Sequence, residues 1–243
     1  MDKYIFLIII IIILISCIIT DKINKIEHYI IDSKIDGPII LLIAGTHGNE
    51  PAGTYALENL INSNISNISI TRGKIIIIPR VNKIGLFLNL RWGFNSFIPI
   101  DYNRNYPSSK NGKTGDYVNK QIINFVNMSD FIIDFHEGWG YNIINPKSMG
   151  SSLYPSNNIF SIKIAEKILV KLNNNIFEPN KKFTINTNSP RIKNTLDSYI
   201  NSLNKNYLLV ETTGQNNVQP LELRIQQITL IINTVIEMFN MNL

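Results

Sequence analysis

Cysteine and charge are scarce in this chain of 243 residues. A single cysteine excludes a disulfide scaffold and a cysteine-rich zinc module. Only 17% of the residues are charged whereas 44% are hydrophobic, which excludes a chain too polar to fold. The length instead suits one domain with a sizeable hydrophobic core.

Basic runs and two common catalytic motifs are also missing. The formal net charge is +5, but no run of basic residues is longer than Lys181-Lys182, so we expect no nucleic-acid partner. Neither GxxxxGK[ST] nor G-x-S-x-G occurs, which disfavours a P-loop protein and a serine hydrolase. The chain has only three histidines, so the place of each one is informative.

Residues 4–20 form one apolar run, YIFLIIIIIILISCIIT, between Lys3 and Asp21. The run is at the short end of what spans a bilayer and also fits the apolar region of a secretory signal peptide. A buried helix is disfavoured because the run has no polar face. We therefore expect residues 1–20 to be a signal peptide or a membrane or lipid anchor, and the protein to be exported or membrane-anchored on the extracytoplasmic side.

The only cysteine, Cys17, lies in that run directly after Leu14-Ile15-Ser16. This order resembles the lipobox of bacterial lipoproteins, in which the cysteine is lipidated and becomes the mature N-terminus. The alternative is that Cys17 is one more apolar residue of the leader. The sequence leaves both readings open, as well as whether residues 1–20 are removed.

Four buried strands and five helices are predicted after the leader. Isoleucine is so frequent, with 48 residues, that its spacing alone is weak evidence. Continuous apolar runs that end in polar or glycine-rich sequence nevertheless indicate strands covered on both faces. The predicted strands are Pro38 to Ala44, Lys74 to Pro79, Phe131 to Phe135 and Tyr207 to Val210, and the predicted helices are Ala52 to Ile61, Tyr117 to Val126, Ile159 to Leu172, Arg191 to Leu203 and Leu221 to Phe239. Their alternation predicts an open α/β sheet.

Chemically versatile side chains follow three of these strands. His47 and Glu50 come after the first strand, His136 after the third and Glu211 after the fourth. Ligands of open α/β sheets bind beyond the carboxyl ends of the strands, so we expect these side chains to converge there. The stretch from Ile84 to Thr114 looks irregular and long enough to be a functional loop region.

The spacing of His47 and Glu50 places both side chains on one side of a helical turn or tight loop. A zinc ion held by two neutral imidazoles and one carboxylate keeps a positive charge and an open coordination position. Pro51 stands where an H-x-x-E-H site needs its second histidine, which excludes that motif. His28 precedes the first strand and is expected at the surface.

Four motifs in order carry a resemblance to a known family: GTHGNEPAG, DYNRNYP at Asp101 to Pro107, DFHEG at Asp134 to Gly138, and ETTG at Glu211 to Gly214. Together they resemble the zinc carboxypeptidase superfamily and, more narrowly, its aspartoacylase/succinylglutamate desuccinylase branch. The similarity runs from about Gly37 to Leu243. It implies a mixed, roughly eight-stranded open sheet with helices on both faces, and a zinc hydrolase catalytic domain over residues 27–243.

The resemblance also implies a role for each motif residue. His47, Glu50 and His136 would be the ligands of one Zn²⁺ ion. Glu211 would be the general base, which takes a proton from the attacking water and passes it to the departing nitrogen. The alternative to this catalytic role is that Glu211 is a structural carboxylate that caps a helix or forms a salt bridge.

Asn103 and Arg104 match the pair that binds the substrate's terminal carboxylate in this superfamily, a contact suited to the planar fork of a guanidinium. Asp101 resembles the carboxylate that orients a ligand histidine, here His47. Arg91 would stabilise the negative charge that develops on the carbonyl oxygen, with Arg80 as a competitor for this role.

Three further expectations concern neighbouring residues. Asp134 could orient a loop or have no chemical role, and the latter is favoured. Glu137 is expected to face away from the metal in a surface or structural role. Family members often contribute a mobile tyrosine near the scissile bond. The candidates are Tyr141, Tyr154, Tyr199 and Tyr207, and the sequence does not choose among them.

The functional expectation is a zinc-dependent hydrolase that cleaves an amide bond next to a free carboxylate, either an N-acyl amino acid deacylase or a carboxypeptidase. The alternative is a non-catalytic metal- or peptide-binding protein that retains the fold. About 30 residues follow Glu211, too few for the β-rich C-terminal domain of typical aspartoacylases, which hints at a more open site and an extended substrate such as a peptide. The acyl group and the oligomeric state do not follow from the sequence.

Overall fold

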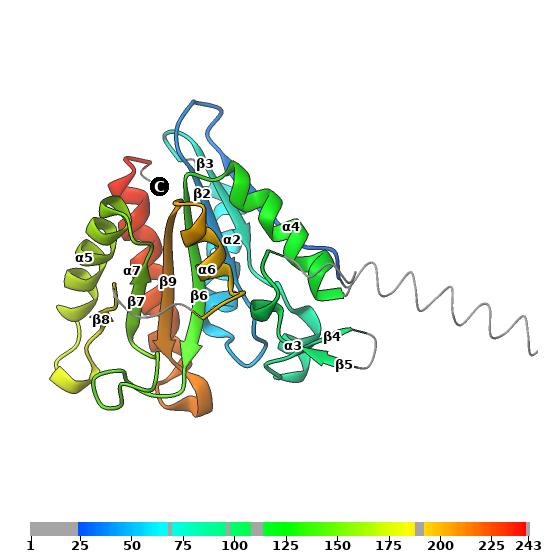
Figure 1. The fold of residues 1–243 in the computed structure, drawn as a ribbon. Helices are drawn as coiled ribbons and strands as arrows, with labels where there is room; N and C mark the ends of the chain where they lie inside the picture. Colours follow the sequence, from blue (N-terminus) through cyan, green and yellow to red (C-terminus); the bar gives the residue numbers. More distant parts are fainter. Residues whose placement is uncertain (1–23, 68–69, 96–97, 108–113, 188–191, 242–243) are drawn as a thin grey trace, which may run out of the picture.

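The computed structural model describes residues 24–67, 70–95, 98–107, 114–187 and 192–241 (Figure 1). Within this part of the chain, seven strands form one sheet in the order β1-β3-β2-β6-β9-β7-β8. The strands are β1 (Tyr29–Asp32), β2 (Ile39–Ala44), β3 (Lys74–Ile78), β6 (Phe131–Gly138), β7 (Ser152–Pro155), β8 (Thr184–Ile185) and β9 (Asn206–Thr213). The predicted α/β sheet is confirmed, with seven strands in the described residues where roughly eight were expected.

The four strands predicted from apolar runs are the parallel centre of this sheet. β3, β2, β6 and β9 run in the same direction, whereas β1 pairs antiparallel with β3 and β7 pairs antiparallel with β9. The sheet is therefore mixed, as expected. Because β2, β6 and β9 are neighbours and parallel, their carboxyl ends lie at the same edge.

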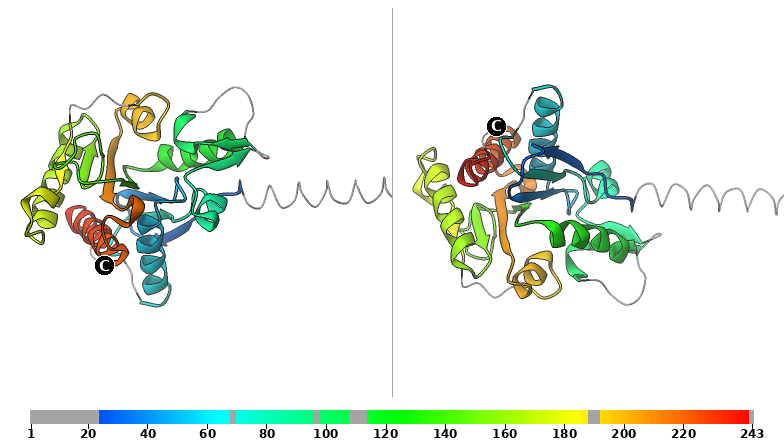
Figure 2. Two further views of the ribbon diagram at one scale, coloured as in Figure 1. Left: turned by 90° about the horizontal axis from the view of Figure 1, so that it is seen from below. Right: turned by 90° about the horizontal axis from the view of Figure 1, so that it is seen from above.

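Helices cover both faces of the sheet (Figure 2). α2 (Ala52–Asn67), α5 (Ile159–Asn173) and α7 (Leu221–Met238) pack on one face, which we call the α7 face. α4 (Thr114–Met128) and α6 (Leu196–Ser202) pack on the other, the α4 face. Strand side chains alternate between the two cores: along β2, Ile40 and Leu42 belong to the α7 face and Leu41 and Ile43 to the α4 face.

The described residues between 84 and 114 form more regular elements than expected. It holds most of α3 (Lys83–Leu88), a hairpin of β4 (Gly93–Asn95) and β5 (Ile98–Ile100), and the 3-10 turn η1 (Tyr102–Arg104). The side chain of Asn82 caps α3 by accepting from Gly85 N, and Asp101 caps η1 by accepting from Asn103 N. Elements this short have no measurable periodicity, so the expectation of an irregular stretch was wrong here.

The last predicted helices differ only at their ends. α6 begins at Leu196 rather than near Arg191, because Thr195 and Ser198 form a capping box at its start. Two further 3-10 turns, η2 (Pro179–Lys181) and η3 (Gln215–Asn217), complete the described elements.

None of the helices in the described residues is both long and apolar enough to cross a bilayer. Residues 4–20 and Cys17 lie outside those residues, so the expectations about them stay predictions.

Candidate active site and metal centre

Three side chains that the sequence singled out meet at the carboxyl edge of the sheet. His47 and Glu50 lie in the turn after β2, closed by a hydrogen bond from Glu50 N to His47 O of 3.2 Å, and His136 lies near the end of β6. His47 Nδ1 is 2.9 Å from Glu50 Oε1, and His136 Nδ1 is 2.8 Å from Glu50 Oε2. All three residues are only 3% exposed, so this polar cluster is shielded from water.

Each histidine has a carboxylate behind it. His47 Nε2 is 3.1 Å from Asp101 Oδ1, and His136 Nε2 is 3.1 Å from Asp134 Oδ2. An ionised carboxylate can only accept, so each Nε2 carries the hydrogen and each Nδ1 is turned toward the shared point beside Glu50. This arrangement orients both rings and makes their Nδ1 atoms better ligands.

The charges in the cluster are strongly coupled. Burial disfavours ionisation of Glu50, but His47 and His136 outweigh it and hold the pKa of Glu50 well below its usual range. Burial also disfavours the imidazolium, yet Asp134 and Glu50 raise the pKa of His136 well above its usual value. Without a cation, Glu50 and His136 are therefore held together as an ion pair.

The donor set fits a zinc ion. One donor atom from each of His47, Glu50 and His136 lies within 4.8 Å of the others, and the two Nδ1 atoms are 3.1 Å apart. Neighbouring donors of a tetrahedral zinc with bonds of about 2.0–2.1 Å lie about 3.3 Å apart, close to this separation. Nitrogen and oxygen donors backed by carboxylates are also the chemistry that zinc prefers.

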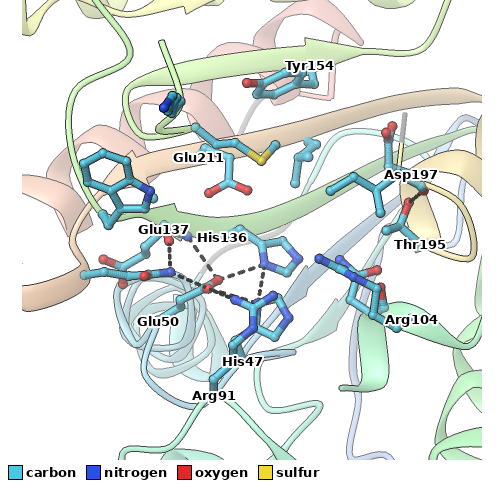
Figure 3. A pocket seen from close by; sticks show the side chains of 18 residues that line it. His47, Glu50, Arg91, Arg104, His136, Glu137, Tyr154, Thr195, Asp197 and Glu211 are labelled. Atoms are coloured by element: carbon cyan, nitrogen blue, oxygen red, sulfur yellow. Dashed lines mark hydrogen bonds and ion pairs between the residues drawn. The ribbon is translucent and has the colours of Figure 1, made fainter. Parts of the chain in front are cut away.

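Glu211 stands beside the donor set on the neighbouring strand. In the β6–β9 register His136 pairs with Glu211, and both side chains project to the α4 face of the sheet. Figure 3 shows the Glu211 carboxylate pointing into the cavity near His136. Burial raises the pKa of Glu211 to about 8, against the opposing effect of His136. A cation at the donor set would lower this pKa by favouring the carboxylate.

Arg91 and Asp101 lie on the other side of the cluster. Arg91 Nη1 donates to Glu50 Oε1 at 3.2 Å and Arg91 Nη2 donates to Asp101 Oδ2 at 3.1 Å. Burial works against ionisation of Asp101, but hydrogen bonding to His47 and the charges of His47 and Arg91 hold its pKa below the usual range. The competitor Arg80 pairs with Glu58 in a separate surface hollow and does not reach this site.

The predicted carboxylate-binding pair is built on η1. Asn103 Oδ1 accepts from Leu196 N at 2.8 Å, which ties the turn to the start of α6. Arg104 Nη1 donates to its neighbour's carbonyl, Asn103 O, at 2.7 Å, and both residues line the cavity. In Figure 3 the Arg104 guanidinium points into the cavity beside His47 and Thr195.

A cavity of about 410 Å³ is lined by the three donor residues together with Arg91, Asn103, Arg104 and Glu211, whereas Asp101 and Asp134 lie behind its wall. Its volume is in the range of small-molecule sites. The sequence did not assign several residues of its wall, namely Trp139, Lys147, Met149, Ile192, Thr195, Asp197 and Leu209. Leu209 lies within β9, and the others lie in loops or at the start of α6, where no motif marked them.

Two neighbours of His136 correct or refine the expectations. Asp134 was expected to do nothing chemical, but it contacts His136 Nε2 and also accepts from Tyr207 Oη at 3.3 Å. The signal was present, since residues two apart on a strand share a face. Glu137 does face away from the metal donors, as expected, but it is 1% exposed and so holds a structural rather than a surface place.

Gln215 and the candidate tyrosines complete the comparison with the predicted site. Gln215 was missed: its Nε2 donates to Glu50 Oε1 at 3.0 Å and to Glu137 O at 2.7 Å. Of the four candidate tyrosines, Tyr154 lines the cavity, and burial raises its pKa. Tyr199 instead stacks on Tyr106, away from the cavity wall.

Solved structures share this fold at low sequence identity. Apo cell shape determinant protein Csd4 from Helicobacter pylori superposes with a TM-score of 0.75 at 18% identity, covering 89% of this chain and 55% of that one. An aspartoacylase family protein from Mesorhizobium loti gives 0.60 at 16% identity, covering 86% and 60%. The mDAP-bound form of Csd4, described as a D,L-carboxypeptidase, gives 0.71 at 19% identity, covering 84% and 51%.

Sequence comparison adds a relative and a family. The N-alpha-acetyl-L-2,4-diaminobutyric acid deacetylase of Halomonas elongata is 32% identical over 110 residues, which are 42% of this chain and 29% of that protein. The match thus spans less than a third of that relative's length. The family model of the succinylglutamate desuccinylase/aspartoacylase catalytic domain matches residues 36–230. The chain therefore belongs to the succinylglutamate desuccinylase/aspartoacylase family.

Proposed function

We propose that the protein is a zinc-dependent hydrolase that cleaves an amide bond next to a free carboxylate. One observation carries the proposal: two imidazole Nδ1 atoms and Glu50 share one point, and the buried Glu211 lies on the adjacent strand. An N-acyl amino acid deacylase and a carboxypeptidase both fit this description. The substrate is then a small N-acyl amino acid or a peptide.

The named relatives support the reaction class. The Halomonas protein is named as a deacetylase of an N-acetylated diamino acid, and the Helicobacter protein is described as a D,L-carboxypeptidase. Both activities hydrolyse a carbon–nitrogen amide bond. The alternative of a non-catalytic binding protein would be favoured by a missing ligand or base, and all four of these residues are present and gathered.

His47, Glu50 and His136 would hold the zinc ion. When bound there, zinc polarises a carbonyl oxygen and makes water a nucleophile at neutral pH. Asp101 and Asp134 keep the two rings in the tautomer that presents Nδ1. The open side of the donor set faces the cavity, where a substrate carbonyl can enter.

Arg104 binds the substrate's free carboxylate through its planar fork, with Asn103 beside it. This contact fixes the distance between the carboxylate and the scissile amide. The hydrogen bond from Leu196 N to Asn103 connects the turn that carries this pair to the start of α6. Amidation of the carboxylate removes both the charge and one acceptor oxygen, so the substrate would be held poorly.

Glu211 moves the proton. As water adds to the acyl carbon, Glu211 takes a proton from it and a carbon–oxygen bond forms. Glu211 then gives that proton to the nitrogen as the carbon–nitrogen bond breaks, which leaves a free amine and a carboxylic acid. Arg91 also lines the cavity, next to Glu50, and its positive charge would stabilise negative charge on the carbonyl oxygen.

The test combines metal analysis with a substrate screen. Purified protein is expected to contain one zinc ion per chain and to hydrolyse N-acyl amino acids or short peptides, detected by mass spectrometry. Substrates with an amidated C-terminus should lose most of the turnover. Glu222→Gln, on the exposed side of α7, is the matched control for Glu211→Gln. Absence of stoichiometric zinc, or normal hydrolysis by Glu211→Gln, would exclude the proposal.

We also propose that residues 1–20 export the protein or anchor it to a membrane, with Cys17 as the lipidated residue if the lipobox is used. The support is the sequence of the apolar run alone. Cell fractionation of the full chain and of a chain lacking residues 1–20 tests the anchor. Labelling with a fatty-acid analogue, compared with Cys17→Ala, tests lipidation. Equal amounts of both chains in the soluble cytoplasmic fraction would contradict the anchor.

A further inference from the structure

A buried ion pair lies behind the metal donors, and the mechanism above does not use it. Glu137 on β6 contacts Arg224 on α7, and the two side chains are 1% and 2% exposed. Side chains alternate along β6, so His136 projects to the α4 face and Glu137 to the α7 face, among the apolar residues of that core. The pair is therefore adjacent to the site in sequence but outside its chemistry.

Glu137 ties the ligand-bearing turn to β6. Its Oε1 accepts from Ala52 N at 2.7 Å, at the first residue of α2 and just after the turn of His47 and Glu50. A carboxylate at a helix N-terminus is stabilised by the unpaired amides and the helix dipole. The backbone of Glu137 adds a second tie, because Glu137 N donates to Glu50 Oε2 at 3.1 Å.

The segment after Glu211 passes directly against the pair. A Cβ atom at Gly214 would overlap both Glu137 Oε2 and Arg224 Nη1, so only glycine leaves room for the contact. The next residue, Gln215, bridges Glu137 O and Glu50 Oε1. The start of α2, the end of β6 and the end of β9 thus all meet the pair.

Stability alone is a weak reason for such a pair. Removing two charges from water costs roughly what their attraction returns, and apolar replacements of buried pairs are often as stable or more so. The core on the α7 face consists of hydrophobic side chains that need no such contact. The pair instead determines relative position, because its contacts connect three segments of the chain.

We propose that the Glu137–Arg224 pair is a positioning clamp that fixes the turn after β2, the end of β6 and the end of β9 relative to one another, and so sets the separation of His47, Glu50 and His136. The inference rests on the proposed function only for the identity of the ion, since the placement of the segments can be measured without metal.

The first experiment measures zinc affinity of the folded full chain by competition with a chelator. Arg224→Met keeps the bulk of the side chain but leaves Glu137 unpaired, and we expect zinc to bind about 10- to 100-fold more weakly, as for other residues that orient ligands. Ile231→Ala, in the same core on α7, is the matched control: it lowers stability through a cavity but should bind zinc as the wild type does.

The second experiment uses hydrogen exchange of the metal-free proteins. Peptides that cover residues 45–57 and 211–217 should exchange faster in Arg224→Met than in the wild type, and not in Ile231→Ala. This readout separates a local loss of placement from a general loss of stability. It also stays informative if the wild type binds no zinc, a result that would exclude the proposed function but not the clamp.

The outcomes are decided against the control. A loss of affinity in Arg224→Met at least about 3-fold larger than in Ile231→Ala, with faster local exchange, upholds the clamp. Equal affinity and equal exchange in the two variants overturn it and leave a purely structural pair. If Arg224→Met does not fold, the double variant Glu137→Gln/Arg224→Met, which removes the unpaired charge, is judged by the same criterion. Arg224→Lys, which keeps the charge, should recover part of the affinity.

Discussion

The two faces of β6 and β9 differ sharply at the carboxyl edge of the sheet. On the α4 face, His136 of β6 and Glu211 of β9 line one cavity, and Asp134 lies behind His136. On the α7 face, the same strands present Phe135 and Val210 to a hydrophobic core, and Glu137 is a buried acidic residue on this side. Because side chains alternate along β6, one side of the strand carries a residue of the candidate active site, and the other side carries the residue that positions the neighbouring segments.

The division of roles between the two faces lets a small domain form a precise site. Hydrophobic packing on the α7 face holds the strands in place. The carboxyl end of the α4 face, which we call the polar face, can therefore carry charged groups that would destabilise a core. Glu50 has opposite partners in His47 and His136, and Asp101 has one in Arg91. The predictions below act on one face at a time.

Removal of the metal should have the largest effect. Dialysis against a chelator is expected to reduce hydrolysis to background, and added Zn²⁺ should restore it, because the proposed reaction requires a Lewis acid at the donor set. Activity and zinc content are measured on the same samples. Full activity after complete removal of zinc would disprove the role of the donor set.

Glu211→Gln tests the polar face next. The amide cannot accept and return a proton, so kcat should fall by about 10²–10⁴-fold, the usual contribution of general acid–base catalysis. Zinc content should stay at the wild-type level, because Glu211 is not a proposed ligand. Steady-state kinetics with parallel metal analysis checks both statements, and a normal kcat would assign the base elsewhere.

Arg104→Lys tests the carboxylate anchor. Lysine keeps the charge but loses the planar fork, so kcat/KM should fall between about 10- and 100-fold for substrates with a free carboxylate. The same variant should differ little from the wild type on amidated substrates, which make no such contact. Kinetics on a matched pair of substrates measures the difference, and an equal loss on both would contradict the assignment.

Asp134→Asn sharpens the comparison within β6. Asparagine is neutral and cannot strengthen His136 as a ligand, so zinc affinity should fall about 10-fold. The fold should persist, because the side chain keeps its size. Chelator competition measures the affinity, and circular dichroism checks the fold. Unchanged affinity would mean that Asp134 only accepts from Tyr207.

The smallest effect is expected on the apolar face. Ile133→Val removes one methylene group from the α7 core and should cost about 0.5–1.5 kcal/mol of unfolding free energy. Zinc affinity should not change, since Ile133 belongs to the α7 core and lies four residues before Glu137 on β6. Denaturant unfolding and chelator competition on one preparation give both values. A clear loss of affinity would show that the two faces are not separable.

The sequence predicted the centre of the fold well and its edges poorly. All four apolar runs became the parallel strands β2, β3, β6 and β9, because fully buried strands need continuous apolar sequence. The strands outside this centre, β1, β7 and β8, were missed, since runs of two to four residues cannot be told from loops. In a chain this rich in isoleucine, an apolar run such as Tyr29–Asp32 carries little information.

The site was predicted where strand ends and motifs marked it. His47, Glu50 and His136 converge as expected, and Asp101 lies against His47. Gln215 and Arg224 were not predictable, because their partners lie 165 and 87 residues away in the sequence and only the folded chain brings them together. Long-range polar pairs of this kind leave no local pattern.

Zinc-edge X-ray absorption on the purified full chain tests the central claim most directly. The account predicts one zinc per chain with two imidazole nitrogens and carboxylate oxygen at about 2.0–2.1 Å, and loss of one imidazole in His136→Ala. A chain that binds no zinc, or a zinc shell that keeps both imidazoles in His136→Ala, would contradict it.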